Sequence, residues 1–281
     1  MKTRVITAVV GLAVLAAVLA FFDTIVFDFV LSAICLLAIH EVFSAMGFGK
    51  KQWYLYAAAV PFTLLVMLTS SQSVRALILP FCFLLVLFLN VCQIAHVQTL
   101  DFGKLSGYVY FSGVIVFCFY SLIHLKRCLP FAQYRYDAIY FILLILCFAW
   151  GGDTAAYFAG RAFGKHKLAP ELSPKKTVEG SVGGFLGAAL CCVLYGLFIS
   201  KVLGHAPVYW MLALYGLLGS LVSQLGDLSF SYIKRQYGIK DYGHLFREHG
   251  GVLDRFDSVT FCAPLTYLLL MIVPFFEYNT L

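Results

Sequence analysis

Four aspartates, five Lys or Arg residues and a His-Gly-Gly run lie within the 34 residues from Gln224 to Asp257. Mg²⁺ takes oxygen ligands from one or two carboxylates and leaves its other positions to water and phosphate. Lys and Arg hold phosphate oxygens, and glycine lets backbone N–H groups approach them closely. Residues of these types in one short segment predict a site for Mg²⁺ and a polyphosphate.

Asp227 lies at the end of an apolar stretch, where an aspartate without a partner is costly, and Ser231 follows one helical turn later on the same face. Asp254 and Asp257 are three residues apart and can share a helix face, with Asp254 expected on an exposed loop. Asp257 has a second interpretation, as the N-cap of a helix beginning at Ser258.

The basic residues and the histidine of this segment also have structural interpretations. Lys234, Arg235 and Arg255 could be the positive flanks of membrane spans, and His249 could be a loop histidine without chemistry.

A second polar segment begins inside an apolar stretch, at Gly151-Gly152-Asp153-Thr154. An intramembrane carboxylate such as Asp153 indicates function, although a helix–helix hydrogen bond through Thr154 or Tyr157 would also explain it.

Further on, Pro174 is followed by two ammonium groups and a hydroxyl, those of Lys175, Lys176 and Thr177. At a helix N-terminus these groups form an anion site. The alternative is that Thr177 is a simple N-cap, with Glu179 in the first turn. Asp28, His40 and Glu41, in an earlier apolar stretch, are interpreted as packing or interface groups.

The elements that must position these residues are membrane helices. The 281 residues are 62% hydrophobic and 12% charged, whereas a soluble domain carries about a quarter charged residues. The apolar stretches exceed the length of a barrel strand and lack alternation, so we expect an all-α, polytopic membrane protein. The first stretch is kept as a span because it is long for a signal peptide and lacks a cleavage site. Nine spans are predicted, at about 5–22, 27–47, 53–69, 76–95, 107–125, 138–160, 180–200, 207–230 and 258–276.

The predicted organisation is a region of N-terminal transmembrane helices, 1–137, followed by a catalytic transmembrane region, 138–281, with charged loops at 161–179 and 231–257. With a cytoplasmic N-terminus, 15 of the 20 Lys and Arg residues, including those of both loops, face the cytoplasm. The net charge of +6 does not indicate a nucleic-acid binder, because the basic residues lie beside apolar spans. Eight of the nine cysteines lie in spans and only Cys128 lies outside, so no disulfide framework is expected.

One motif of the chain reads Ser231-x2-Lys234-Arg235-x4-Lys240-Asp241-x-Gly243-x5-His249-Gly250-Gly251-x2-Asp254-Arg255-x-Asp257. This motif resembles the signature of the CDP-diacylglycerol synthase (phosphatidate cytidylyltransferase) family. Gly226-Asp227 and the run from Ser173 to Gly180 also resemble family motifs, in the expected order. The resemblance covers about 150–258. One departure is Arg247-Glu248, where many members have Pro followed by Gly or Glu.

This resemblance implies transfer of CMP from CTP to phosphatidate, giving CDP-diacylglycerol and pyrophosphate, in a multi-pass protein of the cell membrane. It implies Mg²⁺ as cofactor, with a second metal ion left open, and it leaves a homodimer open. We expect Asp227 and Asp254 to be the principal metal ligands, supported by Asp241 and Asp257. The remaining site residues would bind CTP or the phosphatidate head group. They are Lys234, Arg235, Lys240, His249 and Arg255, together with Asp153, Lys175, Lys176, Thr177, Ser231, Gly250 and Gly251.

Two rival functions stay open at this point. The first rival, which is close to the expected function, is a cytidylyltransferase that acts on another lipid phosphate. It stays open because the motif residues are suited to phosphates and metal and do not select the acyl tails. The second rival, which differs more from the expected function, is a transporter in which Asp153 and Asp227 line an ion path. Against it, the polar residues concentrate in loops. A CDP-alcohol phosphotransferase is excluded, because its paired Asp-Gly…Asp…Asp helix motif is absent.

Overall fold

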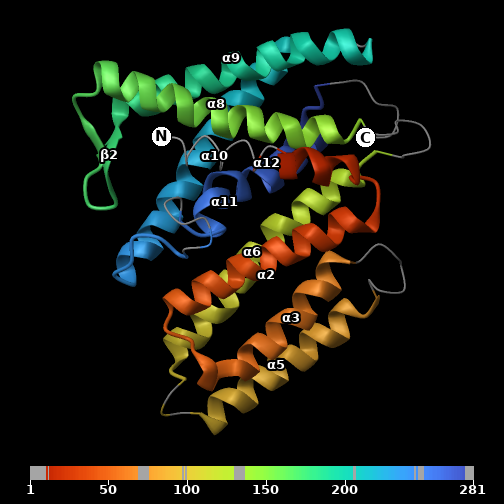
Figure 1. The fold of residues 1–281 in the computed structure, drawn as a ribbon, viewed down its shortest axis with the longest axis vertical. Coiled ribbons are helices and arrows are strands. Elements are labelled where there is room, and N and C mark those ends of the chain that lie inside the picture. The colour runs from red at the N-terminus through yellow and green to blue at the C-terminus, as the bar shows by residue number, and fades with distance from the viewer. Residues whose placement is uncertain are drawn as a thin grey trace. The chain divides into compact units, whose positions relative to one another are not determined.

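Long apolar helices dominate the computed structural model of the protein (Figure 1). It describes residues 11, 13–68, 76–96, 98, 100–129, 137–204, 207–243, 245 and 250–275. Within these ranges, seven helical segments are long and apolar enough to cross a membrane. Lipid offers backbone groups no hydrogen-bond partner, so long helices satisfy the backbone internally. The predicted class, an all-α polytopic membrane protein, is confirmed.

Two of the nine predicted spans are not among these seven. The first, at 5–22, lies partly outside the described residues, although residues 13–20 are helical. The third is helix α3 (Trp53–Met67), which has only 15 residues and contains Pro61. A helix of that length rises less than the roughly 30 Å thickness of the hydrocarbon core. The nine cysteines are free in this structure.

The chain divides into two compact units, and neither is a single stretch of sequence. The first unit comprises Met1–Ile123 and Asp241–Asp254. It contains α2 (Ile25–Ala45), the short 3-10 helix η1 (Lys50–Gln52), α3, α5 (Ile78–Ala95) and most of α6 (Phe102–Lys126). Its core forms around Phe43, whose ring packs on those of Phe48, Tyr56 and Tyr108, and the Tyr108 hydroxyl donates a hydrogen bond to the Leu55 carbonyl.

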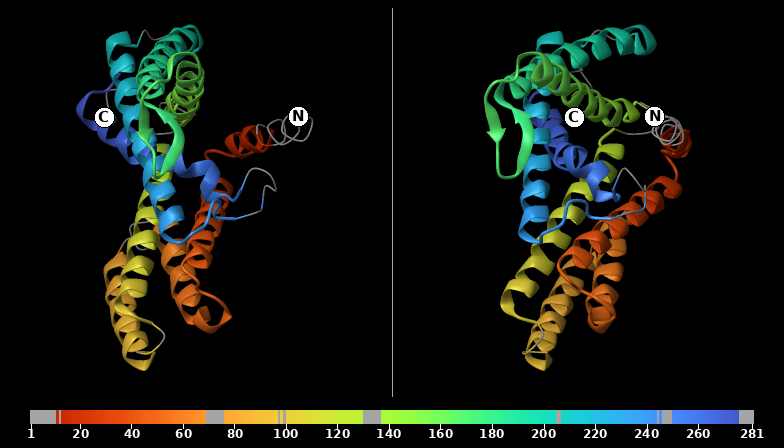
Figure 2. Two further views of the ribbon diagram at one scale, coloured as in Figure 1. Left: turned by 90° about the vertical axis from the view of Figure 1, so that its left-hand side faces the viewer. Right: turned by 60° about the vertical axis from the view of Figure 1, so that its left-hand side comes forward.

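The second unit comprises His124–Lys240 and Arg255–Leu281. It contains α8 (Ile139–Phe163), α9 (Val178–Leu203), α10 (Tyr209–Gln236) and α12 (Cys262–Ile272), and most of α11 (Leu253–Thr260). Between α8 and α9 the chain forms an antiparallel hairpin of β1 (Lys167–Ala169) and β2 (Ser173–Thr177). Helices α8 and α9 lie side by side in every view (Figures 1 and 2).

Small residues bring the helices of this unit close together. A Cβ atom on Gly180 of α9 would lie 2.9 Å from the Ala156 carbonyl oxygen of α8, and one on Gly216 of α10 would lie 2.5 Å from the Ala189 Cα of α9. Such contacts between backbones are typical of helix packing in membranes, where apolar burial drives association less than close contact does. The hairpin between α8 and α9 therefore extends from a tightly packed helix pair.

The predicted loop bounds are wrong at three places. The segment 161–179 is largely a helix end and a hairpin. Helix α10 continues through Ser231, Lys234 and Arg235 to Gln236, because neither glycine nor proline occurs between Gly226 and Gly238. There the chain turns with φ +65°, and the amides of Gly238 and Ile239 bond the carbonyls of Arg235 and Lys234, a Schellman ending.

The third correction concerns the last helical segment, which begins earlier than the predicted residue 258. Helix α11 begins at Leu253, so Asp254, Arg255 and Asp257 are helical residues and not loop residues. The interpretation of Asp257 as the N-cap of a helix starting at Ser258 is therefore wrong, although its Oδ1 does accept a hydrogen bond from the Ser258 amide at 2.8 Å. Asp254 is buried, against the expectation of an exposed loop position.

Candidate functional site

Charged and hydroxyl side chains from four elements meet in the second unit. Lys176 of β2 places its Nζ 2.5 Å from Oδ2 of Asp227 on α10. The Ser231 hydroxyl, one turn further along α10, donates to Oδ1 of Asp227 at 3.3 Å. Asp153 of α8 lies within electrostatic range of Asp227 and Lys176, and its carboxylate is hydrogen-bonded by Ser258 of α11. We call these five residues the Asp153–Asp227 cluster.

Close backbone packing holds α11 against α10 beside this cluster. A Cβ atom on Gly226 would lie 2.8 Å from the Asp257 carbonyl oxygen, so only glycine fits here. This contact places the Asp257–Ser258 segment next to Asp227, the neighbour of Gly226. The Gly226-Asp227 pair thus combines a packing residue with a chemical one.

The hairpin reaches the cluster because both of its ends are fixed. Thr177 closes β2 and caps α9, its Oγ1 accepting a hydrogen bond from the Gly180 amide at 3.1 Å, so the capping interpretation of Thr177 holds. Lys176 stands one residue before this cap. Its position is therefore determined by the start of α9.

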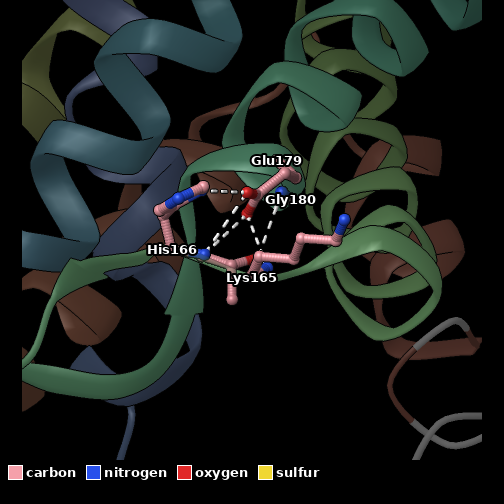
Figure 3. A network of polar contacts seen from close by, with 5 residues as sticks. Lys165, His166, Glu179 and Gly180 are labelled. Atoms are coloured by element: carbon pink, nitrogen blue, oxygen red, sulfur yellow. Dashed lines mark hydrogen bonds and ion pairs between the residues drawn. The ribbon is translucent and has the colours of Figure 1, made fainter.

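Glu179 fastens the other end of the hairpin (Figure 3). Its Oε1 lies 2.6 Å from Nδ1 of His166, and its carboxylate accepts the backbone amides of Lys165 at 3.1 Å and His166 at 3.3 Å. The sequence indicated Glu179 only as a first-turn acid. Its role in closing the base of the hairpin depends on a chain reversal that sequence spacing does not show.

Arg235 connects α10 to the hairpin. Its Nε donates to the Leu172 carbonyl at 3.4 Å and its Nη1 to the Ile239 carbonyl at 3.3 Å. The guanidinium was expected to hold phosphate, but here it bonds backbone oxygens. Arginine has five N–H donors, so further donors remain for an anion.

A second group of motif residues lies in the first unit. Oδ2 of Asp254 accepts hydrogen bonds from the amides of Tyr242 at 2.8 Å and Gly251 at 2.9 Å. Gly250 has φ +79°, and a Cβ atom there would lie 2.7 Å from the same oxygen. Gly251 was expected to offer its amide to phosphate, whereas in this structure the amide bonds Asp254. We call residues 250–254 the motif turn.

The other predicted site residues are distributed as follows. Lys175, Lys240, Asp241 and Arg255 are exposed, Lys234 is half-buried in the last turn of α10, and His249 lies outside the described residues, as do Arg247 and Glu248. The structure therefore brings together Asp153, Lys176, Asp227 and Ser231 from the predicted set. It groups Gly250, Gly251 and Asp254 separately.

Asp153 and Asp227 are the residues of the cluster whose carboxylates could hold a magnesium ion. In the described part of the chain, no group of three or more His, Cys, Asp or Glu side chains is arranged to hold a metal ion. Mg²⁺ often needs only one or two carboxylates, with water and phosphate completing its shell. Asp153 and Asp227 could supply such a pair, and one of these carboxylates, that of Asp227, is paired with the Lys176 ammonium in this structure.

Fold and site together define a class: a polytopic helical membrane protein in which a lysine of a β-hairpin lies beside carboxylates of two long helices. Comparison with known sequences gives the family. The sequence model described as "Cytidylyltransferase family" matches residues 2–273, nearly the whole chain. The chain belongs to this family.

Several relatives carry the name phosphatidate cytidylyltransferase. That of Staphylococcus epidermidis is 42% identical over 141 residues, covering 50% of this chain and 53% of the relative. That of Bacillus subtilis is 37% identical over 166 residues, 58% of each chain. That of Brucella suis is 46% identical over 127 residues, 45% of each chain. The chain thus spans about half the length of the curated relatives it matches.

Proposed function

We propose that this protein transfers CMP from CTP to phosphatidate, giving CDP-diacylglycerol and pyrophosphate. The observation that carries the proposal is the Asp153–Asp227 cluster, in which carboxylates and an ammonium group converge next to the motif residues Ser231 and Asp257. Family membership and the names of the relatives support the choice of CTP and phosphatidate. The membrane helices agree with a lipid substrate.

The reaction requires little acid–base chemistry from the protein. A phosphate oxygen of phosphatidate, already ionised at neutral pH, attacks the α-phosphorus of CTP. The bond from that phosphorus to the bridging oxygen of the β-phosphate breaks, and pyrophosphate leaves with the electron pair. The difficulty is that two anions must meet in line, so catalysis depends on positioning and charge neutralisation.

Residues of the cluster are suited to those two tasks. Lys176 would exchange its ion pair with Asp227 for an ion pair with a phosphate oxygen of the substrate. The negative charge of the entering phosphate would thereby be neutralised. Asp153 and Asp227 would hold Mg²⁺, which supplies electrostatic stabilisation of the phosphates. Ser231 would keep the Asp227 carboxylate in a fixed orientation through its hydrogen bond.

The outer residues of the site would bind the phosphates further from the reacting atoms. Lys175, Lys240 and Arg255 are exposed cations with long side chains, suited to anionic groups that arrive from water or from the lipid surface. We further propose that the hairpin and the motif turn face the cytoplasm, where CTP is available. The bias of basic residues supports this orientation.

The test is transfer of radiolabel from α-³²P-CTP to lipid by the purified full chain in lipid nanodiscs. Phosphatidate, a polyprenyl phosphate and an ether-linked phosphatidate are supplied in parallel, with ATP as the competing nucleotide. We expect labelled CDP-diacylglycerol with phosphatidate, dependent on Mg²⁺ and abolished by EDTA.

Each alternative outcome has a clear meaning. Label transferred preferentially to the polyprenyl phosphate would replace phosphatidate as the substrate while keeping the chemistry. Equal rates with ATP and CTP would refute a cytidylyltransferase. As a matched control, Glu171→Gln removes an exposed carboxylate of the same hairpin and should leave transfer unchanged.

A further inference from the structure

Glu41 is a buried carboxylate of α2 in a segment long and apolar enough to span the membrane. The sequence offered it no site, because nothing near it in the chain is polar enough to complete one. Burying a carboxylate is costly unless hydrogen bonds replace the lost water. The structure supplies those bonds from residues more than 200 positions away.

Both oxygens of Glu41 bond the motif turn. Oε1 accepts the Val252 amide and Oε2 the Leu253 amide, each at 2.8 Å. Leu253 is the first residue of α11, so these are N–H groups at a helix N-terminus, which have no partner within the helix. The negative charge also lies at the positive end of the helix dipole.

Carboxylates thus fix three consecutive amides of the turn. The Gly251 amide donates to Asp254, and the next two donate to Glu41. Each bond involves an ionised acceptor, and such hydrogen bonds are roughly twice as strong as those between neutral groups. The turn that carries Asp254 is therefore held from inside by its own aspartate and from α2 by Glu41.

Two glycines of the motif are explained by the same carboxylate. A Cβ atom on Gly243 would lie 2.6 Å from Oε1 of Glu41, and one on Gly251 would overlap the carboxylate. Glycine at these positions lets Glu41 approach the backbone closely. This explanation differs from the expected one, in which the glycines make room for phosphate.

We propose that Glu41 is a positioning residue for the reaction: through the Val252 and Leu253 amides it fixes the start of α11 and hence the direction of the Asp254 side chain. The proposal rests on the proposed function, since the effect it predicts on turnover concerns CMP transfer. It also gives the N-terminal helices a part in the chemistry. Their contribution is the Glu41 carboxylate, which bonds the amides of the motif turn.

The experiment compares Glu41→Gln with Asp28→Asn in the full chain in nanodiscs. Glutamine has one acceptor oxygen and one NH2 group, which donates. It can therefore keep one of the hydrogen bonds from the Val252 and Leu253 amides, but its NH2 group faces the other N–H group, and two donors cannot bond each other. Asp28 is a buried carboxylate of the same helix, 13 residues earlier, and has no place in the site. Its substitution controls for loss of a buried charge in α2.

Two measurements are made on each variant. Hydrogen exchange followed by mass spectrometry reports on the peptide that covers 250–256 and on peptides of α8, α9 and α10. Steady-state kinetics give kcat and the KM for CTP. For Glu41→Gln we expect faster exchange in 250–256 alone, kcat lower by about 10- to 100-fold and KM within about threefold, since a small displacement of a reacting group lowers the rate more than binding.

The other outcomes would overturn the proposal. Unchanged exchange in 250–256 would show that Glu41 does not hold the turn, and unchanged kcat with faster exchange would show that holding it is irrelevant to turnover. Faster exchange throughout α8 to α10, or an equal effect of Asp28→Asn, would indicate a general structural role. If the wild type transferred no CMP, the proposed function would fail on the radiolabel assay, while the exchange data would still decide whether Glu41 anchors the turn.

Discussion

Removing Lys176 should destabilise the protein more than removing its partner Asp227. Lys176→Met leaves Asp153 and Asp227 within electrostatic range of each other without the ammonium group that attracts both carboxylates. Asp227→Asn breaks the same ion pair, but the lysine then remains beside Asp153. The asymmetry follows from a cluster in which two carboxylates share one cation.

The burial of the pair sets the expected magnitude. Lys176 and Asp227 are 27% and 29% exposed, between the surface pairs that contribute about 0–1 kcal/mol and the buried pairs whose disruption costs about 3–5 kcal/mol. We expect about 2–3 kcal/mol for Lys176→Met and about 1 kcal/mol for Asp227→Asn. With about 2–4 °C per kcal/mol for chains of this size, Tm should fall by about 4–12 °C and about 2–4 °C.

Thermal unfolding of the purified variants, followed by tryptophan fluorescence, measures the difference. Lys104→Met is the matched control, because its partner Asp101 is 3.9 Å away and the two are 46% and 65% exposed. That substitution should cost less than about 0.5 kcal/mol. Mg²⁺ should raise the Tm of Lys176→Met more than that of the wild type, because a cation that binds the folded state stabilises it. A larger loss for Asp227→Asn, or equal losses for the Lys176 and Lys104 variants, would refute the reasoning.

Two further predictions concern the motif and its orientation. Asp254→Asn should keep the two amide hydrogen bonds through its carbonyl oxygen but lose the negative charge, which should lower kcat by at least about 10²-fold. Asp257→Asn should keep a kcat near that of the wild type, because Asn can accept the same hydrogen bond from the Ser258 amide. An inactive Asp257→Asn protein would place that residue in the site. Cysteines introduced at Glu171 and Lys240 should react with an impermeant maleimide only in inverted vesicles, and labelling in intact cells would contradict the cytoplasmic orientation. Background from Cys128 should be low, since burial raises the pKa of its thiol to about 12.

Much of the helical architecture could be predicted from the sequence, because lipid imposes one solution on long apolar segments. Spans predicted at 27–47, 76–95 and 138–160 became α2, α5 and α8 with ends shifted by a few residues. The ends were least predictable where polar residues continue a helix beyond the apolar stretch. Helix α10 runs on to Gln236 because its stop is Gly238 and not the first lysine.

The contacts of the site were less predictable than its residues. Asp227 and Lys176 were both candidates, but they are 51 positions apart, and their ion pair depends on the return of the chain through the hairpin that Glu179 closes. Glu41 was interpreted only as a packing or interface group, because its partners are backbone amides of the motif turn. Every residue except proline has a backbone N–H group, so the side-chain pattern of a sequence does not predict which N–H group a carboxylate will bond.

A motif can therefore identify a family without telling which of its positions touch substrate. In this protein Gly226 admits the backbone of α11, Gly250 adopts a left-handed turn beside Asp254, and Gly251 leaves room for Glu41. These three glycines are accounted for by packing and backbone conformation, before any phosphate is considered. The side chain of Asp227, by contrast, bonds only Lys176 and Ser231 among its hydrogen-bond and ion-pair partners in the described residues, and both contacts can be exchanged for those of a substrate or a metal ion. The chemistry should thus be sensitive to charge at Asp227 and Lys176, whereas the packing should be sensitive to side-chain volume at the three glycines.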